Sequence, residues 1–308
     1  MHIQSKHGVS CTEYGEGVVY GLWNRELYIE NLTESGAFVV VEMEAPVLSV
    51  HRLNQKVYAG DVDGSVWEVE RNTAKRLFTR KSDTSTAPAV LSITSYKNTL
   101  ACVFHHGEIV LYSTSSCAIS KVVRTSSKIE SVFGEERMVI YVTNRTQIEM
   151  YNLESGVRTK RKSLLENAPI TAAVVLGAGD REVLAYGTAV GKVAIDYLTE
   201  GVDATSYVFK AHKKEKGGQE VFYPVTMLKG VGPSELVTGG MDGNIYTWDI
   251  KQRKRTTILY KSEKSIIAGT IKTEATLPPK IMIVTGSPID ISHPEETTDV
   301  FTIEVLTV

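Results

Sequence analysis

The feature that most constrains this chain is a turn followed by a strand, which recurs about every 40 residues. Apolar and polar residues alternate in segments such as 66–69 and 148–151, and this period of two is typical of half-buried strands. Turn signals such as Asp63-Gly64 and Asp242-Gly243 stand shortly before a β-branched residue. Alignment on the first β-branched residue or leucine after each turn gives seven positions, at successive intervals of 39, 43, 39, 45, 52 and 55 residues: Leu27, Val66, Ile109, Ile148, Val193, Ile245 and Val300.

This recurrence predicts an all-β fold, a seven-bladed β-propeller that spans residues 1–308 as a single domain. One four-stranded blade cannot bury both of its faces, so each must stack on its neighbours. The chain starts with a short segment, 1–8, before the first turn, and ends with a strand-like segment, 300–305. We predict that the N-terminal segment pairs with the last blade, which closes the ring and removes its open edges.

Composition narrows the class of protein. Of the 308 residues, 23% are charged and 42% hydrophobic, which is typical of a soluble globular protein. A net charge of -2 argues against direct DNA binding through the overall field, although a local basic patch is compatible with it. Cys11, Cys102 and Cys117 form no CxxC pair, so we expect a reducing compartment, and no apolar run is long enough for a membrane span. We therefore expect a nuclear or cytosolic protein that does not associate with membranes and that is a monomer.

No motif for catalysis, a cofactor or a metal is present in the sequence. Phosphate loops, dinucleotide-binding glycines, nucleophile elbows and zinc-binding HExxH are all missing. His105 and His106 are adjacent, so on a strand they would point to opposite faces, and only in a turn could they share a metal. Trp67, Trp248 and Cys102 are interpreted as core residues. We expect no enzyme; a catalytic site in the propeller channel is the enzymatic alternative.

In propellers of this kind, the turn between the second and third strands of each blade opens on one face of the disc. The residues expected in these turns are Trp23, Asp63, His105, Arg145, Lys192 and Asp242. A tryptophan in a turn has less to pack against than one in a strand, so Trp23 is a candidate recognition anchor. The alternative is partial packing of its ring against a neighbouring loop.

A lysine-rich segment, 207–218, reads as a short strand that runs into a basic, glycine-terminated loop. We expect this loop to open on the same face as Lys192, where Lys210, Lys213 and their neighbours could hold a phosphate through charge-assisted hydrogen bonds. The alternative is a solvated loop that only maintains solubility. A second basic run, 251–255, is interpreted as a solvated hairpin on the opposite face.

The best-preserved repeat, residues 236–249, resembles the WD-repeat signature in full. The segments 191–198, 207–213, 223–225 and 238–243 follow one another as in the mitotic-checkpoint propellers of the budding-uninhibited-by-benzimidazole family and their sister, the messenger-RNA export propeller. Residues 160–163, Trp23 and the segment 293–295 extend the resemblance, which is strongest over about 158–249. The His-Pro-Glu sequence of 293–295 favours the checkpoint member.

The resemblance implies a non-enzymatic adaptor, in the nucleus or cytoplasm and at kinetochores in mitosis. Its implied partners are a short motif of checkpoint kinases and the phosphorylated Met-Glu-Leu-Thr repeats of a kinetochore scaffold. The export alternative would bind a nucleoporin segment instead. The residues implied for the peptide are Trp23, His105 and Asp242, and those for the phosphate are Lys192, Lys210 and Lys213.

This chain departs from the family at two positions of that implied site. Ile170 stands where the family has an arginine, and His105 where it has a second turn tryptophan. Lysine also lacks the planar grip of the arginines that are usual at Lys192 and Lys213. We therefore expect weaker phosphopeptide binding than is usual in the family, or a different motif.

Overall fold

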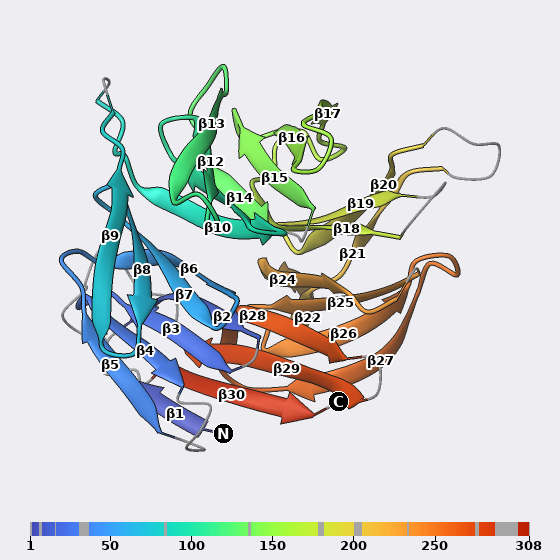
Figure 1. Cartoon of the computed structure of the whole chain (residues 1–308). Coiled ribbons are helices and arrows are strands. Elements are labelled where there is room, and N and C mark those ends of the chain that lie inside the picture. The colour runs from blue at the N-terminus through green and yellow to red at the C-terminus, as the bar shows by residue number, and fades with distance from the viewer. Residues whose placement is uncertain are drawn as a thin grey trace. The chain divides into compact units, whose positions relative to one another are not determined.

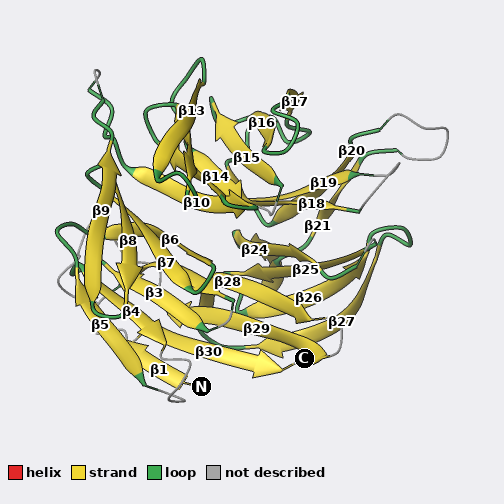
Figure 2. Ribbon diagram, in the orientation of Figure 1, coloured by secondary structure: helices red, strands yellow, loops and turns green. Residues whose placement is uncertain are grey.

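The computed structural model describes residues 2–5, 8–15, 17–30, 37–82, 85–134, 137–177, 182–199, 205–232, 234–274, 277–286 and 301–307. Within these ranges the regular structure consists of strands, and Figure 2 draws no helix. Correspondingly, no helix of the described chain could cross a membrane. The chain divides into two compact units, one of residues 7–161 and one of residues 1–6 with 162–308.

In the described part of the unit of residues 7–161, the strands form four antiparallel sheets, each of four strands that are consecutive in the chain (Figure 1). The sheets are β2–β5 (Val9–Tyr14, Val18–Leu22, Glu26–Glu30, Phe38–Glu42), β6–β9 (Val47–Leu53, Lys56–Asp61, Ser65–Glu70, Thr73–Thr79), β10–β13 (Val90–Tyr96, Thr99–Phe104, Glu108–Ser113, Ala118–Arg124) and β14–β17 (Ser131–Gly134, Met138–Thr143, Gln147–Asn152, Arg158–Lys162).

Among the residues described in the other unit, the strands form three sheets of four strands and one separate hairpin. They are β18–β21 (Ile170–Leu176, Val183–Thr188, Lys192–Tyr197, Tyr207–Lys210), the hairpin β22–β23 (Lys213–Lys216, Gln219–Phe222), β24–β27 (Val225–Gly230, Glu235–Gly240, Asn244–Asp249, Lys254–Lys261), and the sheet of β28 (Ser265–Glu274), β29 (Leu277–Gly286), β30 (Phe301–Thr307) and β1 (His2–Ser5).

The residues used to align the repeats lie at equivalent places in the structure. Six of the seven belong to the third strand of a sheet and are completely buried, with 0% exposure: Leu27, Val66, Ile109, Ile148, Val193 and Ile245. The seventh, Val300, lies outside the described residues, as does the segment 287–299. The sequence recurrence therefore marks one repeated core position.

Neighbouring sheets within each unit bury their faces against each other. Val19 of β3 and Val57 of β7 share one cluster, and Phe104 of β11 packs against Phe78 of β9 in the next. In the other unit, Ile195 of β20 and Val225 of β24 lie in one cluster, while β25 and β29 contribute to another. This stacking removes apolar surface that a lone sheet would expose to water on one face.

The N-terminal strand completes the last sheet. β1 pairs antiparallel with β30, with Ile3 opposite Ile303 and Ser5 opposite Phe301, so the strand order is β1-β30-β29-β28. The predicted pairing of the N-terminal segment with the last sheet is therefore observed. Its contribution to stability stays a prediction.

Candidate functional site

The lysines predicted to bind phosphate all lie in the unit of residues 162–308. Lys192 begins β20 and is in register with Lys210 at the end of β21. Lys213 follows three residues later, at the start of β22. The structure thus brings these three lysines into one stretch of surface. The sequence analysis had grouped them only by analogy with other propellers.

The lysine-rich loop is a β-hairpin, which corrects the sequence interpretation. β22 and β23 pair from Lys213 opposite Phe222 to Lys216 opposite Gln219. Gly217 and Gly218 form the turn with φ values of 58° and 78°, a backbone that suits two consecutive glycines in a tight hairpin. The hairpin gives the lysines alternating directions and a defined spacing.

A carboxylate missed in the sequence analysis lies inside the lysine cluster. Lys210 Nζ donates to Glu220 Oε2 at 2.6 Å, and Lys213 also pairs with Glu220. The hydrogen bonds from Lys210 and Lys213 lower the pKa of Glu220 to about 2, so its charge is present throughout the neutral range. Among the described residues, Lys192 has no carboxylate within ion-pair distance. The cluster of Lys192, Lys210, Lys213 and Glu220 thus carries a net positive charge.

The lysine hairpin is attached to the β19–β20 turn through its backbone. Ala211 and His212 donate their amides to the carbonyl oxygen of Gly191, at 2.9 and 3.1 Å, and Tyr223 donates to the carbonyl of His212 at 3.1 Å. Gly191 has a φ of 69°, and an added Cβ would lie 2.4 Å from the His212 oxygen. Only glycine permits this close approach, which fixes Lys192 next to the hairpin.

Asp242, predicted to contact peptide, has a different place in the structure. Its side chain is completely buried, and its Oδ1 lies 2.7 Å from Nδ1 of His212, which is buried as well. Asn244 donates its side-chain amide to Asp242 Oδ2 at 2.8 Å. No surface of the Asp242 side chain is available to a peptide, and the residue instead joins the β25–β26 turn to the base of the lysine hairpin.

A chain of buried hydrogen bonds continues from Asp242 into the sheet. His212 Nε2 lies 2.9 Å from Thr238 Oγ1, and Trp248 Nε1 donates to the same oxygen at 3.0 Å. Because Thr238 accepts from Trp248, its own proton is free for His212 Nε2, and we infer that Nδ1–H donates to Asp242. Burial raises the pKa of Asp242, but the hydrogen bonds from His212 and Asn244 outweigh it, so the pKa is lowered.

The predicted peptide residues Trp23 and His105 lie in the unit of residues 7–161. Trp23 occupies the β3–β4 turn, where its side chain is 46% exposed and its amide donates to Gly8 at 3.0 Å. His105 lies in the equivalent β11–β12 turn and is partly buried, which together with nearby Lys128 and His106 lowers its pKa. Trp23 is thus exposed on a turn whose backbone is hydrogen-bonded, and its role as a peptide anchor stays a prediction.

An unpredicted charge network adjoins His105. Arg80 donates two hydrogen bonds to Glu108 Oε2, at 2.9 and 2.6 Å, and Arg124 donates to Oε1 at 3.2 Å. Burial raises the pKa of Glu108, but the hydrogen bonds from Arg80 and the nearby His106, whose Nε2 lies 3.3 Å from Oε2, outweigh it and lower the pKa. Long-range pairing of this kind has no local sequence signal. No group of three or more metal-ligating side chains occurs among the described residues.

The remaining predicted positions have the following places. Ile170 begins β18 and is buried, with 5% exposure. The basic run 251–255 is exposed: residues 251–253 form the turn between β26 and β27, and the last two residues begin β27. Arg253 covers the ring of Tyr207 at 4.4 Å. The segment 293–295 lies outside the described residues.

The fold is matched by a solved structure over almost the whole chain. The crystal structure of RRP9 WD40 repeats has a TM-score of 0.69, covers 99% of this chain and 97% of its own, and is 11% identical. The seven four-stranded sheets and this likeness confirm the predicted class, a seven-bladed WD-repeat β-propeller. No model of a known protein family matches the sequence.

Sequence relatives carry checkpoint names. The spindle assembly checkpoint protein bub3 of Schizosaccharomyces pombe is 22% identical over 280 residues, 85% of this chain and 84% of the relative. The mitotic checkpoint protein bub3 of Dictyostelium discoideum is 24% identical over 47% of this chain and 41% of the relative. Mitotic checkpoint protein BUB3.1 of Arabidopsis thaliana is 36% identical over 24% of this chain and 22% of the relative. In sequence the chain is thus similar to mitotic-checkpoint proteins of the bub3 type, and its fold is that of a WD-repeat propeller.

Proposed function

We propose that this protein is a non-enzymatic adaptor of the spindle checkpoint, which acts in the nucleus and at kinetochores in mitosis. In this proposal it binds a short motif of a checkpoint kinase and a phosphorylated Met-Glu-Leu-Thr repeat of a kinetochore scaffold. The relatives described above have checkpoint names, which favours this role over messenger-RNA export.

The observation that carries the phosphopeptide half is the lysine cluster around Glu220. Lys192 has no carboxylate partner among the described residues, while Lys210 and Lys213 share one. A phosphothreonine carries about -1.5 to -2 charges at neutral pH, more than one carboxylate. It can therefore compete with Glu220 for two ammonium groups and engage Lys192 as well.

The kinase-motif half rests on Trp23. Its ring is nearly half exposed, on a turn whose backbone is held by Gly8, so its burial by a peptide would remove apolar area from water without reordering the turn. We propose Trp23 and His105 as peptide contacts and omit Asp242, because its side chain is buried.

Titration of a Met-Glu-Leu-phosphothreonine peptide tests the proposal. We expect the double variant Lys192→Ala with Lys213→Ala to bind at least about tenfold more weakly than the wild type, a loss within the range of one charge-assisted hydrogen bond. Lys214→Ala with Lys216→Ala is the matched control, because these lysines belong to the same hairpin but lie over Tyr223, at 5.6 and 5.8 Å from its ring. Equal affinities of wild type and the Lys192 and Lys213 variant would remove the assigned site.

A further inference from the structure

A row of four basic side chains at the start of β27 has no acidic partner in the described chain. Lys251 and Arg253 lie in the turn between β26 and β27, Lys254 and Arg255 lie in β27 itself, and all four are exposed. None of them forms an ion pair with a carboxylate of the described residues. Asp249, the last residue of β26, already accepts two backbone amides of the turn at its Oδ1, both at 2.9 Å. This basic row therefore carries a net positive charge.

The two arginines of the basic row are held against aromatic rings. The guanidinium carbon of Arg253 lies 4.4 Å from the centre of the Tyr207 ring, and that of Arg255 lies 4.8 Å from the centre of the Tyr246 ring. Arg253 Nη2 also donates to the carbonyl oxygen of Thr205 at 3.3 Å. Cation–π contacts of this kind position a guanidinium while N–H donors at its edge stay available. Both arginines are thus oriented before a planar anion such as a carboxylate arrives.

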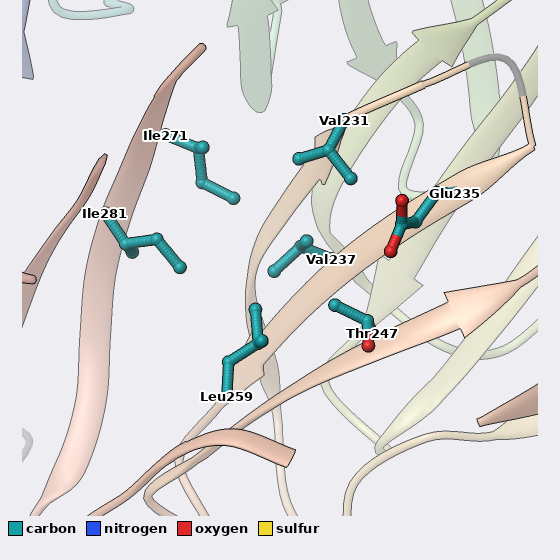
Figure 3. A pocket seen from close by; sticks show the side chains of 7 residues that line it. All are labelled: Val231, Glu235, Val237, Thr247, Leu259, Ile271 and Ile281. Atoms are coloured by element: carbon teal, nitrogen blue, oxygen red, sulfur yellow. The ribbon is translucent and has the colours of Figure 1, made fainter. Parts of the chain in front are cut away.

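The rings under the arginines form one continuous row on one side of the sheet. Tyr207 is 6.1 Å from Phe209, Phe209 is 4.6 Å from Trp248, and Trp248 is 6.0 Å from Tyr246, between ring centres. Thr247 alternates with the last two and lines a cavity of about 160 Å³ on the other side, against β28 and β29 (Figure 3). The row of rings therefore joins β21 to β26, and the two arginines cover its two ends.

Another sheet contains an equivalent arginine that is bound to a carboxylate. Arg76 of β9 and Arg255 of β27 each follow the aligned buried residue of their sheet by ten positions. Arg76 also lies over an aromatic ring, that of Trp67, at 4.5 Å. Its guanidinium pairs with the carboxylate of Glu44, and the two side chains are 45% and 66% exposed. An arginine at this position of a sheet therefore binds a carboxylate at the surface.

Arg255 lacks the partner that Arg76 has. Glu44 is the third residue before β6, whereas the third residue before β24 is Phe222. The ring of Phe222 is apolar and is covered by Lys210 at 5.2 Å. Within the described chain no other acid replaces Glu44 at Arg255. Its guanidinium is therefore left for an acid from another molecule.

The basic row begins at the other end of the sheet from the lysine cluster. Asn244 is the first residue of β26 and follows the turn that contains Asp242, whereas Asp249 is the last residue and precedes the basic row. Six residues of strand span roughly 20 Å at about 3.3 Å per residue. An inference about the basic row therefore does not rest on the proposed phosphate site.

We propose that the basic row binds an acidic segment of a partner protein, whose aspartate or glutamate carboxylates pair with Arg253 and Arg255. Lys251 and Lys254 add attraction to the same segment without a fixed geometry. The charges of the row are complementary to such a segment. A nucleic acid is the less favoured ligand, because the rings on which its bases would stack are already covered by the arginines.

Methyl NMR of the whole chain tests this inference. Ile258 is the reporter, because it is 52% exposed and lies opposite Tyr246 on β27. The probes are short peptides of glycine and serine in which every second residue is glutamate, glutamine or lysine. We expect the glutamate peptide to shift the Ile258 methyl signal to saturation and to bind more weakly as salt is added. The glutamine peptide should bind at least about threefold more weakly, as expected for the loss of exposed ion pairs, and the lysine peptide should cause no shift.

A pair of double variants links this binding to the two arginines. Arg253→Ala with Arg255→Ala should weaken binding of the glutamate peptide at least about threefold. The matched control is Arg71→Ala with Lys75→Ala, which removes two exposed charges from the corresponding part of the β6–β9 sheet. Arg71 has a φ of 55° and Arg253 one of 54°, so both variants place alanine in the same kind of backbone. The control should keep the wild-type affinity.

A third variant separates the basic row from the lysine cluster. Lys192→Ala with Lys213→Ala should leave the response of Ile258 to the glutamate peptide unchanged, and loss of that response would overturn the proposal. Equal affinities of the wild type for the glutamate and glutamine peptides, or no shift of Ile258 with any peptide, would also overturn it. So would saturation of the Ile258 shift by a DNA oligonucleotide of equal charge at a lower concentration than the glutamate peptide.

Discussion

Replacement of His212 by alanine tests whether the buried hydrogen-bond chain holds the β24–β27 sheet and the lysine hairpin together. The ring is completely buried and lies 2.7 Å from the Asp242 carboxylate and 2.9 Å from the Thr238 hydroxyl. Its removal deletes both hydrogen bonds and leaves Asp242 with Asn244 as its main remaining donor. It also leaves a cavity beside Gly240. The ring packs so closely on this glycine that an added Cβ would lie 2.4 Å from His212 Nδ1.

The magnitude follows from the partners that are lost. A hydrogen bond to a charged group contributes about 1.5–3 kcal/mol, and one between neutral groups about 0.5–1.5 kcal/mol. Loss of the ring also leaves the buried Asp242 carboxylate short of one donor, which costs about 1–3 kcal/mol or more for a charged group. We therefore expect His212→Ala to lower the free energy of unfolding by about 3–5 kcal/mol. At about 2–4 °C per kcal/mol, the melting temperature should fall by roughly 6–20 °C.

Denaturant titration and thermal melting of wild type and variant measure this loss. His105→Ala is the control, since its imidazole is only partly buried, and it should cost less than about 1 kcal/mol. In a double-mutant cycle, His212→Ala with Asp242→Asn should show a coupling energy of about 1 kcal/mol or more. A loss below about 1 kcal/mol for His212→Ala would refute a stabilising role for the hydrogen-bond chain.

Three further predictions concern pH, anion binding and the N-terminal strand. Because folding lowers the pKa of Asp242, the ionised carboxylate stabilises the folded state above its unfolded pKa of about 3.9, and this stabilisation is lost as the pH falls through the folded pKa. The wild-type denaturant midpoint should therefore fall below about pH 4, and this fall should be smaller in Asp242→Asn. Glu220→Gln frees Lys210 and Lys213, so the phosphopeptide should bind about threefold or more tightly in a titration, and unchanged affinity would contradict competition by Glu220. Deletion of residues 1–8 exposes the edge of β30 and should lower the melting temperature sharply; an unchanged temperature would count against closure by β1.

Much of the fold could be predicted because its signal is periodic. The aligned residues after each turn, such as Leu27 and Ile245, occupy the same buried position in successive sheets. The spacing of these residues in the sequence therefore predicts the repeat of the sheets in the structure. The hairpin β22–β23 lacks that signal. Its strands are rich in lysine and glutamate and largely exposed, so no alternation of apolar residues reveals them. The remaining signal was the Gly217-Gly218 pair, which is typical of a hairpin turn.

The site was less predictable because its contacts are distant in the sequence. Asp242 was expected to be exposed on the basis of its turn, and only the approach of His212, 30 residues earlier, makes it a buried partner. The pairing of Arg80 with Glu108 likewise crosses 28 residues. Charged side chains select partners in space, and a single sequence gives residue types without these distances.

Glu220 changes how the lysine cluster should be understood. Lys192 and Lys210 are directly opposite on β20 and β21, an arrangement in which like charges repel. Glu220 offsets this repulsion by accepting from Lys210 and Lys213, so the hairpin can keep its lysines together without a bound anion. Phosphate binding at this site would then be an exchange of one anion for another. Because a dianion gains more from three ammonium groups than a carboxylate does, such an exchange would favour phosphothreonine over the aspartate or glutamate of an unmodified peptide.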